Sequence, residues 1–405
     1  MLIKSEFPEM DRTVTLDTVD GLSSRLVDLV QDLRCDILTP NPRKHPPTFT
    51  STQVAEMCGI DRQRLHYLAT REGSDLPPGE VQKNGRIRNF TLTETRRWIQ
   101  QVSAISKSAM LDGGAGMGRV LAISNFKGGS CKTTTAMCIA QGLSLRGRKV
   151  LVVDLDPQAS LTELCGLYAE KMLGEDDTLL PHIYSPDENK LEDVVQRTYW
   201  DGIDVIPAHP TLFAAEFYIP AQVSKQENFR FWSILRDGFA PLRRNYDYII
   251  LDTAPSLSYL TINGLMAADS MIMPLVPESL DFISSVSFWT LFNDMAGSFK
   301  EGGDKNKKFD FVSVLLSRVD NSPTSSVSVV RTWVQAAYGH WTSAVEVPAS
   351  SVMSTGAVGL ATVFDVSKWD GGNKTLARIR EPLEHYCRWL DEFYVGSGVL
   401  KNEHA

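Results

Sequence analysis

The sequence contains no uninterrupted apolar run long enough to cross a membrane. Its strongest apolar runs, at residues 150–153 and 249–251, have the length of β-strands, whereas a membrane-spanning helix needs about 20 apolar residues. The N-terminus has no basic segment followed by an apolar block, so we expect no secretory signal. Hydrophobic residues make up 43% of the chain, which is enough to build packed cores and excludes wholesale disorder.

Cysteine is scarce and scattered. The six cysteines include no C-x-x-C pair and none that pairs with a histidine at metal-binding spacing. We therefore expect neither a disulfide framework nor a zinc site, and a reducing cytoplasm fits this usage. The net charge of −8 argues against a uniformly basic nucleic-acid coat, but it leaves room for a local basic module.

Several domains are expected, because 405 residues exceed the size of one ordinary domain. Residues 1–47 hold an amphipathic helical pattern from Leu16 to Leu33 that stops at a proline-rich linker. Its apolar stripe needs a covering surface, either on the same chain or on a second copy. Residues 48–110 form a second unit, and a glycine-rich linker at 111–118 leads to a third unit at 119–405.

In the third unit, β-branched runs alternate with segments of helix length. This alternation predicts an α/β fold, in which helices flank a mostly parallel sheet, and a closing helix is expected after Lys374. The expected strands cover residues 120–124, 150–153, 203–206, 248–251, 271–275 and 311–316.

A phosphate-binding loop follows the first of these strands. The segment Phe126–Thr135 reads F-K-G-G-S-C-K-T-T-T and opens a helix, so it offers backbone N–H groups and lysine charge to a phosphate chain. It departs from the usual G-x-x-x-x-G-K-[ST] pattern, because Phe126 and Cys131 replace the glycines. We expect Lys132 to reach the β- and γ-phosphates and the Thr133 hydroxyl to bind Mg²⁺. The predicted nucleotide-binding residues of this loop are Lys127, Gly128, Gly129, Ser130, Cys131, Lys132, Thr133 and Thr134.

Two later strands end in aspartates. One leads into D-L-D-P-Q at 154–158, and the other ends in I-L-D-T-A-P-S at 250–256. Carboxylates at the carboxyl ends of parallel strands face the crevice in which open α/β sheets bind ligands. Asp252 therefore suits Mg²⁺ coordination through water, together with Thr133, and Asp156 suits orientation of an attacking water.

Through these motifs, residues 120–394 resemble the ParA family of DNA-partition ATPases, in the deviant Walker-A class that also contains MinD and the nitrogenase iron protein. The resemblance implies binding of ATP and ADP with Mg²⁺, and hydrolysis of ATP by a homodimer. It implies that Lys127 crosses the dimer interface to the second subunit's ATP and that Arg318 lies near the adenine. Ser130 and Cys131 replace the commoner Val-Gly pair, so loop geometry and turnover can differ. The predicted catalytic residues are Lys127, Lys132, Asp156 and Asp252.

The second unit has the pattern of a helix, a glycine turn and a helix. Thr50 or Ser51 is expected to cap the first helix, Gly59 to make the turn and Asp61 to cap the second helix. Asn84-Gly85 then predicts a hairpin between basic strands. The unit resembles the winged helix-turn-helix of larger plasmid-type ParA proteins, which autoregulate their operon. The predicted DNA contacts are Arg62, Gln63, Arg64, His66, Tyr67, Lys83, Arg86 and Arg88.

The resemblance also implies partners. These are operator DNA, non-specific nucleoid DNA contacted through Arg331, and a ParB-like centromere-binding protein that stimulates hydrolysis. A cytoplasmic, nucleoid-associated protein without membrane contact is expected.

Two other functions remain open: a nucleotide-sensing repressor with little hydrolysis, and a membrane-cycling ATPase of the MinD kind. For the second, the helix expected at 376–394 is a poor lipid anchor, because it carries more acidic than basic residues. An electron-transfer iron protein would need cluster cysteines that the sequence lacks.

Overall fold

The protein divides into two compact units, residues 1–44 and residues 45–405. The computed structural model describes residues 15–38, 44–81, 88–103, 117–168, 172–227, 229–301, 307–322, 326–353, 359–366 and 372–396. In the first unit, helix α1 covers Leu16–Leu38, which confirms the amphipathic helix predicted there and extends it beyond Leu33. No helix in the described part of the chain is long and apolar enough to cross a membrane.

The second unit begins with a small N-terminal module, residues 45–103. Three short strands form an antiparallel sheet in the order β1-β3-β2. Two of the three helices, α2 and α4, pack against this sheet and against each other, and α3 packs against α2. Its elements are β1 (Phe49–Thr50), α2 (Ser51–Cys58), α3 (Arg62–Thr70), β2 (Glu80–Val81), β3 (Arg88–Phe90) and α4 (Leu92–Val102).

The ends of α2 and α3 follow the sequence closely. Thr50 caps α2 in a capping box with Gln53, and Asp61 caps α3 by accepting from the backbone N–H of Arg64 at 2.7 Å. Gly59 ends α2 in the left-handed region, with φ of +67°, where a side chain would be strained. The two helices and the glycine turn therefore lie where the sequence predicts them; whether they bind DNA stays a prediction.

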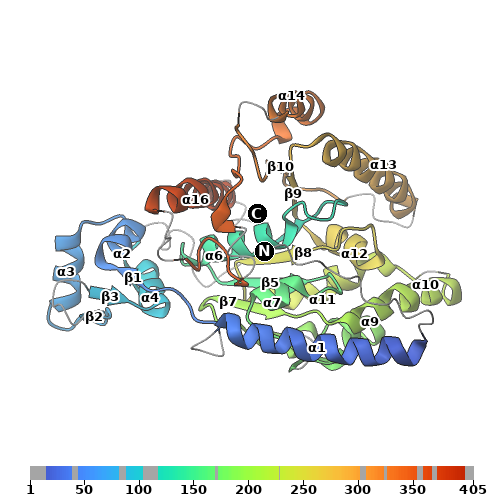
Figure 1. The fold of residues 1–405 in the computed structure, drawn as a ribbon, viewed down its shortest axis with the longest axis horizontal. Coiled ribbons are helices and arrows are strands. Elements are labelled where there is room, and N and C mark those ends of the chain that lie inside the picture. The colour runs from blue at the N-terminus through green and yellow to red at the C-terminus, as the bar shows by residue number, and fades with distance from the viewer. Residues whose placement is uncertain are drawn as a thin grey trace, which may run out of the picture. The chain divides into compact units, whose positions relative to one another are not determined.

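The rest of the second unit is built on a seven-stranded sheet in the order β10-β9-β4-β8-β5-β7-β6 (Figure 1). Every neighbouring pair is parallel except β6 with β7, so the predicted α/β fold is confirmed, and the antiparallel edge strand β6 is an addition. The strands are β4 (Arg119–Ile123), β5 (Val150–Asp154), β6 (Gln196–Arg197), β7 (Ile203–Ile206), β8 (Tyr248–Asp252), β9 (Ser270–Leu275) and β10 (Val312–Leu316).

Helices cover both faces of this sheet. Alternate residues of β4 point to opposite faces: Leu121 and Ile123 pack with α6 and α16, whereas Val120 and Ala122 pack with α11 to α14. The closing helix expected after Lys374 is α16. The helices are α6 (Lys132–Ser144), α7 (Ser160–Leu164), α9 (Leu180–Tyr184), α10 (Ala215–Lys225), α11 (Ile234–Leu242), α12 (Tyr259–Ala267), α13 (Ser279–Glu301), α14 (Val327–Tyr338) and α16 (Asn373–Gly396).

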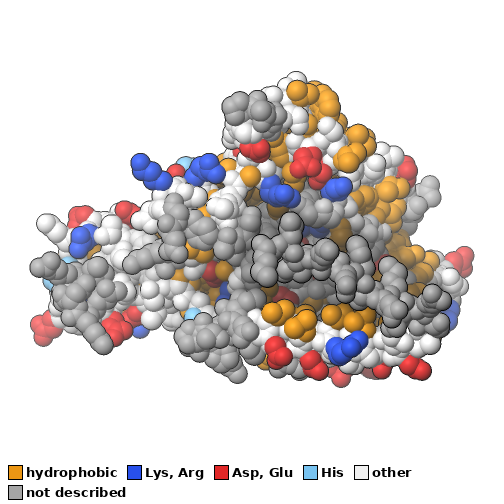
Figure 2. Space-filling view, viewed as in Figure 1, with side chains coloured by type: hydrophobic (Ala, Val, Ile, Leu, Met, Phe, Trp, Pro, Cys, Tyr) orange, Lys and Arg blue, Asp and Glu red, His pale blue; other side chains and the backbone are white. Residues whose placement is uncertain are grey.

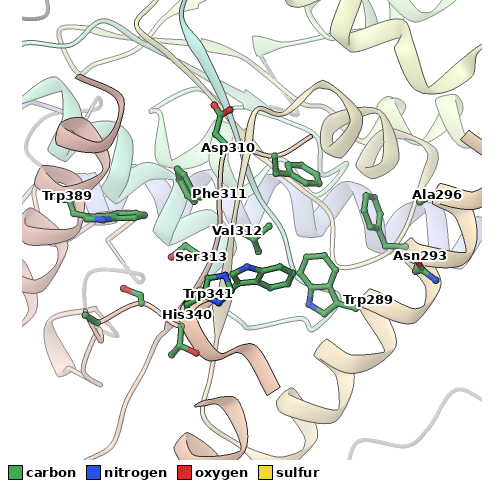
Figure 3. A pocket seen from close by; sticks show the side chains of 15 residues that line it. Trp289, Asn293, Ala296, Asp310, Phe311, Val312, Ser313, His340, Trp341 and Trp389 are labelled. Carbon is green, nitrogen blue, oxygen red and sulfur yellow. The ribbon is translucent and has the colours of Figure 1, made fainter. Parts of the chain in front are cut away.

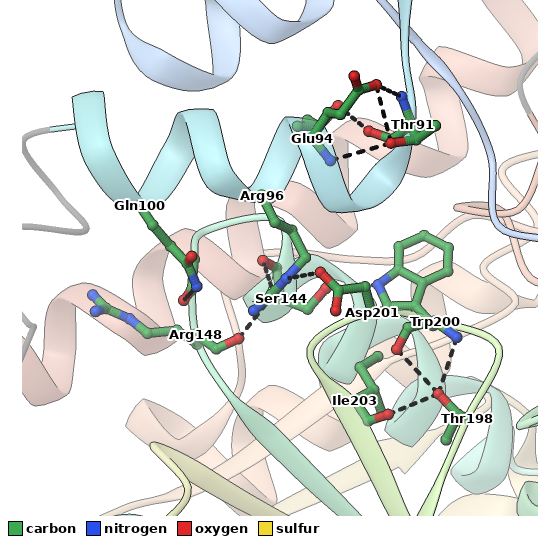
Figure 4. Close-up of polar contacts among 12 residues, drawn as sticks. Thr91, Glu94, Arg96, Gln100, Ser144, Arg148, Thr198, Trp200, Asp201 and Ile203 are labelled. Atoms are coloured by element: carbon green, nitrogen blue, oxygen red, sulfur yellow. Dashed lines mark hydrogen bonds and ion pairs between the residues drawn. The ribbon is translucent and has the colours of Figure 1, made fainter. Parts of the chain in front are cut away.

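A buried arginine joins the N-terminal module to the sheet domain (Figure 4). From α4, Arg96 donates to the carbonyl oxygens of Ser144 at 2.6 Å and Arg148 at 3.0 Å, and its Nε lies 3.2 Å from a carboxylate oxygen of Asp201. The neighbouring Gly202 has no side chain to occupy the space of this guanidinium. One continuous apolar core also runs through both parts, so the boundary expected between them is not a break in packing.

Candidate functional site

The phosphate-binding loop connects β4 to α6 at the carboxyl edge of the sheet. Gly129 and Cys131 both have left-handed backbone conformations, with φ of +76° and +68°, and the helix begins at Lys132. The side chain of Lys132 is only 6% exposed, and its Nζ donates to the carbonyl oxygen of Lys127 at 3.1 Å. Burial lowers the pKa of Lys132, while the carboxylates of Asp252 and Asp156 act to raise it. The lysine therefore lies over the loop, where its charge is available to a phosphate chain.

Sequence reasoning missed Asn125, which anchors this loop. Its side chain accepts a hydrogen bond from the backbone N–H of Lys127 at 3.2 Å and donates to the carbonyl oxygen of Pro274 at 2.7 Å. The loop is thereby fastened to the end of β9. Asn125 directly precedes the loop motif, but nothing in its residue type marks it as an anchor before the strand order is known.

Asp281, in the first turn of α13, is a second residue that the sequence did not indicate. It is buried, and burial raises the pKa of its carboxyl, while the charges of Lys127 and Arg318 act to lower it. The structure thus places an acidic group within electrostatic range of Lys127 and Arg318, two of the basic residues that were predicted to bind the nucleotide.

Asp252 ends β8 beside the loop, and both of its carboxylate oxygens are buried without a hydrogen-bond partner in the described structure. Burial raises the pKa of Asp252 well above its usual range, and the neighbouring Asp154 adds to the rise. The Thr133 hydroxyl and the Lys132 ammonium oppose that rise. A buried carboxylate with free oxygens beside a hydroxyl is a donor set that suits Mg²⁺, which prefers oxygen ligands.

Asp154 is the last residue of β5, and Asp156 follows in the loop after it. Asp154 is completely buried, and its carboxylate accepts three hydrogen bonds, one from Asp156 in the loop after β5 and two from Thr162 in α7. Burial raises the pKa of Asp154 to about 7, although these hydrogen bonds act to lower it. The side chain of Asp156 is half-buried, and its Oδ1 accepts from the backbone N–H of Gln158 at 3.0 Å.

A cavity of about 520 Å³ opens beside the loop. Cys131, Thr134 and Arg318 line it together with the segment 347–351 and Arg378. Arg318 is exposed and has a φ of +53°, in the left-handed region. The structure therefore brings Arg318 to the same cavity as Cys131 and Thr134 of the loop; its place near an adenine stays a prediction.

A larger cavity, of about 730 Å³, lies elsewhere, and several aromatic side chains line it (Figure 3). It opens between α13, the edge strand β10 and α16, and no residue of the phosphate-binding loop lines it. Trp289, Trp341 and Trp389 point toward this space. Cavity size alone would therefore select the wrong place for the phosphate-binding site.

On α3, all five predicted DNA-contact residues are exposed, while Leu65 and Leu68 face the core. The Arg64 guanidinium lies over the ring of Tyr67, 5.5 Å from its centre. Arg88 is half-buried, and its guanidinium donates to the carbonyl oxygen of Pro78 at 2.5 Å, so its DNA contact stays a prediction. The predicted contacts Lys83 and Arg86 lie outside the described residues.

Arg331 of α14 is also engaged within the protein. Its Nε and one Nη lie 2.6 Å from the two carboxylate oxygens of Glu346, and the same Nη donates to Asn321 at 3.3 Å. This bidentate pair raises the pKa of Arg331. A DNA phosphate would have to compete with Glu346 for this guanidinium. Figure 2 shows one face of the molecule, where basic and acidic side chains are interspersed, with no single basic field among the coloured residues.

The sheet order and the loop between β4 and α6 define a P-loop nucleotide-binding domain. Residues 118–298 match the model of the AAA domain family. A solved structure described as a partition protein has a TM-score of 0.66, with 17% identity, and the match covers 96% of this chain and 99% of that one. That similarity concerns the fold.

Two relatives specify the family. A putative replication protein A of Rhizobium rhizogenes is 31% identical over 312 residues, which are 75% of this chain and 75% of that protein. The chromosome partitioning protein ParA of Myxococcus xanthus is 38% identical over 166 residues, which are 41% of this chain and 55% of that protein. The chain belongs to the ParA family of partition ATPases.

Proposed function

We propose that this protein is an ATP-dependent partition ATPase that also binds DNA, non-specifically in its ATP form and specifically at its own operator as an autorepressor. One observation carries the proposal: the phosphate-binding loop lies beside Asp252, a buried carboxylate whose two oxygens have no hydrogen-bond partner among the described residues. The loop amides and Lys132 suit the negative charge of a triphosphate, and the Asp252 carboxylate suits its Mg²⁺.

Each residue of the site has a part in this proposal. The loop amides from Lys127 to Thr134 and the Lys132 ammonium bind the phosphates, as their place at the start of α6 allows. Thr133 and Asp252 hold the cation, which neutralises charge on the phosphates. Asp156 orients the attacking water, and Lys127 acts on the nucleotide of a second copy in a homodimer.

The proposed DNA contacts divide into two sets. Arg62, Arg64 and their exposed neighbours on α3 can reach base edges, and base contacts carry sequence specificity. Non-specific binding needs only phosphate charge. A ParB-like protein is the proposed partner that stimulates hydrolysis, on the strength of the family alone.

The ATPase proposal is tested by ATP hydrolysis and ATP binding in the full chain. Lys132→Ala should abolish measurable ATP binding, because the loop amides alone cannot neutralise the triphosphate. Lys127→Gln should keep some binding but lose ATP-dependent dimerisation, whereas Asp156→Ala should trap the ATP-bound dimer. Analytical ultracentrifugation with ATP distinguishes these two variants by the fraction of dimer. Normal ATP affinity in a folded Lys132→Ala variant would contradict the assignment, as would identical behaviour of the other two variants.

The DNA proposal is tested by footprinting on the region upstream of the protein's own gene and by bulk DNA binding at matched salt. Arg64→Ala should weaken specific binding by about 1–3 kcal/mol and leave ATP-dependent bulk binding nearly unchanged. Equal loss of both modes would show that the two surfaces are not separate. A chain that binds this DNA but does not hydrolyse ATP would favour the nucleotide-sensing repressor instead.

A further inference from the structure

At this edge of the sheet, both carboxylate oxygens of Asp154 accept hydrogen bonds from the segment that follows β5. Its Oδ2 accepts hydrogen bonds from the backbone N–H of Thr162 at 2.9 Å and from the Thr162 hydroxyl at 2.8 Å. Its Oδ1 accepts from the backbone N–H of Asp156 at 3.2 Å. The carboxylate therefore binds Asp156 in the loop after β5 and Thr162 in α7, the helix that follows this loop.

Thr162 extends this connection to a second segment. Its hydroxyl donates to Asp154 and also accepts from the backbone N–H of Ala208 at 2.9 Å, and both Asp154 and Thr162 are completely buried. Ala208 follows β7, the next strand in the sheet. One carboxylate and one hydroxyl thus hold together the segments that leave two neighbouring strands.

The loop between them is held in a conformation that it would not adopt freely. Ala159 has a φ of +55°, a region that costs a residue with a side chain about 1–2 kcal/mol. Such conformations persist where the surroundings determine them. The hydrogen bonds to Asp154 on either side of Ala159 are surroundings of that kind.

The half-buried Asp156 depends on this loop for its position. In the described structure, its carboxylate accepts a hydrogen bond from the backbone N–H of Gln158, inside the same loop. A group that orients water must be placed to within a fraction of an ångström, and such precision comes from the residues that support it.

We propose that Asp154 and Thr162 are positioning residues for ATP hydrolysis, which act by fixing the loop that carries Asp156. This inference rests on the proposed ATPase function. It assigns Asp154 no contact with nucleotide or cation, because both of its oxygens already accept hydrogen bonds from Asp156 and Thr162. It predicts an effect on turnover rather than on nucleotide affinity.

The test compares full-length variants for turnover with Mg²⁺-ATP and non-specific DNA, and for equilibrium binding of a non-hydrolysable ATP analogue. Thr162→Val removes only the hydroxyl and keeps the shape, Thr162→Ser restores the hydroxyl, and Asp154→Asn removes one acceptor. Thr178→Val is the matched control. The hydroxyl of the buried Thr178 also donates one hydrogen bond and accepts another, but its acceptor is the backbone carbonyl of Glu175 and its donor is the backbone N–H of Leu180.

We expect Thr162→Val and Asp154→Asn each to lower kcat about tenfold or more, because small displacements near the reacting groups are costly. Analogue affinity should change less than about threefold, and the double variant should be little worse than the more damaging single one. Thr162→Ser and Thr178→Val should stay near wild type.

Wild-type kcat in Thr162→Val, or parallel loss of kcat and analogue affinity, would overturn the inference while the ATPase proposal stands. The inference would also be overturned if the kcat losses of the two single variants multiplied in the double variant. Absence of hydrolysis by the wild-type chain would instead overturn the proposed function, and this inference with it.

Discussion

Asp154 and Asp252 are direct Cα partners on the adjacent parallel strands β5 and β8, yet their carboxylates differ in hydrogen bonding. Asp154 accepts three hydrogen bonds from the segment that follows β5, whereas among the described residues no donor reaches either oxygen of Asp252 in hydrogen-bond geometry. Two buried acids so close together raise each other's cost of ionisation. The pair therefore leaves one carboxylate for the loop and one for a cation.

The buried carboxylate of Asp252 should lower the free energy of unfolding when no cation is bound. A raised pKa in the folded state means that the folded protein holds its proton to higher pH than the unfolded chain does. Stability of the nucleotide-free protein should therefore fall as pH rises from about 4, the unfolded value, through about 7, the pKa of Asp154. Asp252→Asn should be more stable than wild type at pH 8 by about 1–3 kcal/mol, and the difference should shrink at pH 5.

Denaturant unfolding at the two pH values, without Mg²⁺, measures this difference. The same variant should lose Mg²⁺-dependent ATP hydrolysis, so gain of stability and loss of activity are expected together. A variant less stable than wild type at pH 8 would show that Asp252 is not an uncompensated buried charge.

Cys131 occupies a left-handed position where the commoner motif has glycine, with a φ of +68°. Cys131→Gly should raise the free energy of unfolding by about 1 kcal/mol, because glycine adopts this conformation without strain. Cys131→Ala is the control, since it removes the thiol but keeps the strained Cβ, and it should not stabilise. Equal stabilisation by both substitutions, measured by urea unfolding, would assign the effect to the thiol instead of the backbone.

Arg96 should be a main attachment of the N-terminal module. Arg96→Ala should destabilise the protein by about 2–3 kcal/mol, since hydrogen bonds to charged groups contribute about 1.5–3 kcal/mol. The adjacent Arg97 is exposed, and Arg97→Ala should change stability by less than about 0.5 kcal/mol. Hydrogen exchange of α4 measures both variants, and unchanged protection in Arg96→Ala would show that the shared apolar core alone holds the module.

Substitutions of Arg331 and of its partner Glu346 should change DNA affinity in opposite directions. If it contacts DNA, Arg331→Ala should weaken bulk DNA binding by the ATP form for all sequences and reduce the salt slope by about 1. Glu346→Gln should strengthen the same binding, because it weakens the bidentate pair that now holds the guanidinium. Salt titrations of DNA affinity measure both. If Glu346→Gln leaves the affinity unchanged, Arg331 is a structural residue of α14.

Local signals in the sequence were sufficient for many elements. The six predicted strands are all present, because continuous apolar β-branched runs suit the buried strands of a parallel sheet. Thr50, Gly59 and Asp61 cap or end their helices as expected, since these effects act over a few residues. The phosphate-binding loop was recognisable for the same reason: its chemistry lies in one short segment.

The tertiary structure decided which charged groups remain available for ligands. Nothing near Arg88 or Arg331 in the sequence shows that Pro78 and Glu346 occupy them, because each partner is ten or more residues away and meets its arginine only after folding. The difference between Asp154 and Asp252 likewise depends on the order of strands in the sheet. By itself, the sequence determined the elements, their caps and the residue types of the site, since these follow from local spacing. Which carboxylates and guanidinium groups are free to bind a ligand depended on long-range packing.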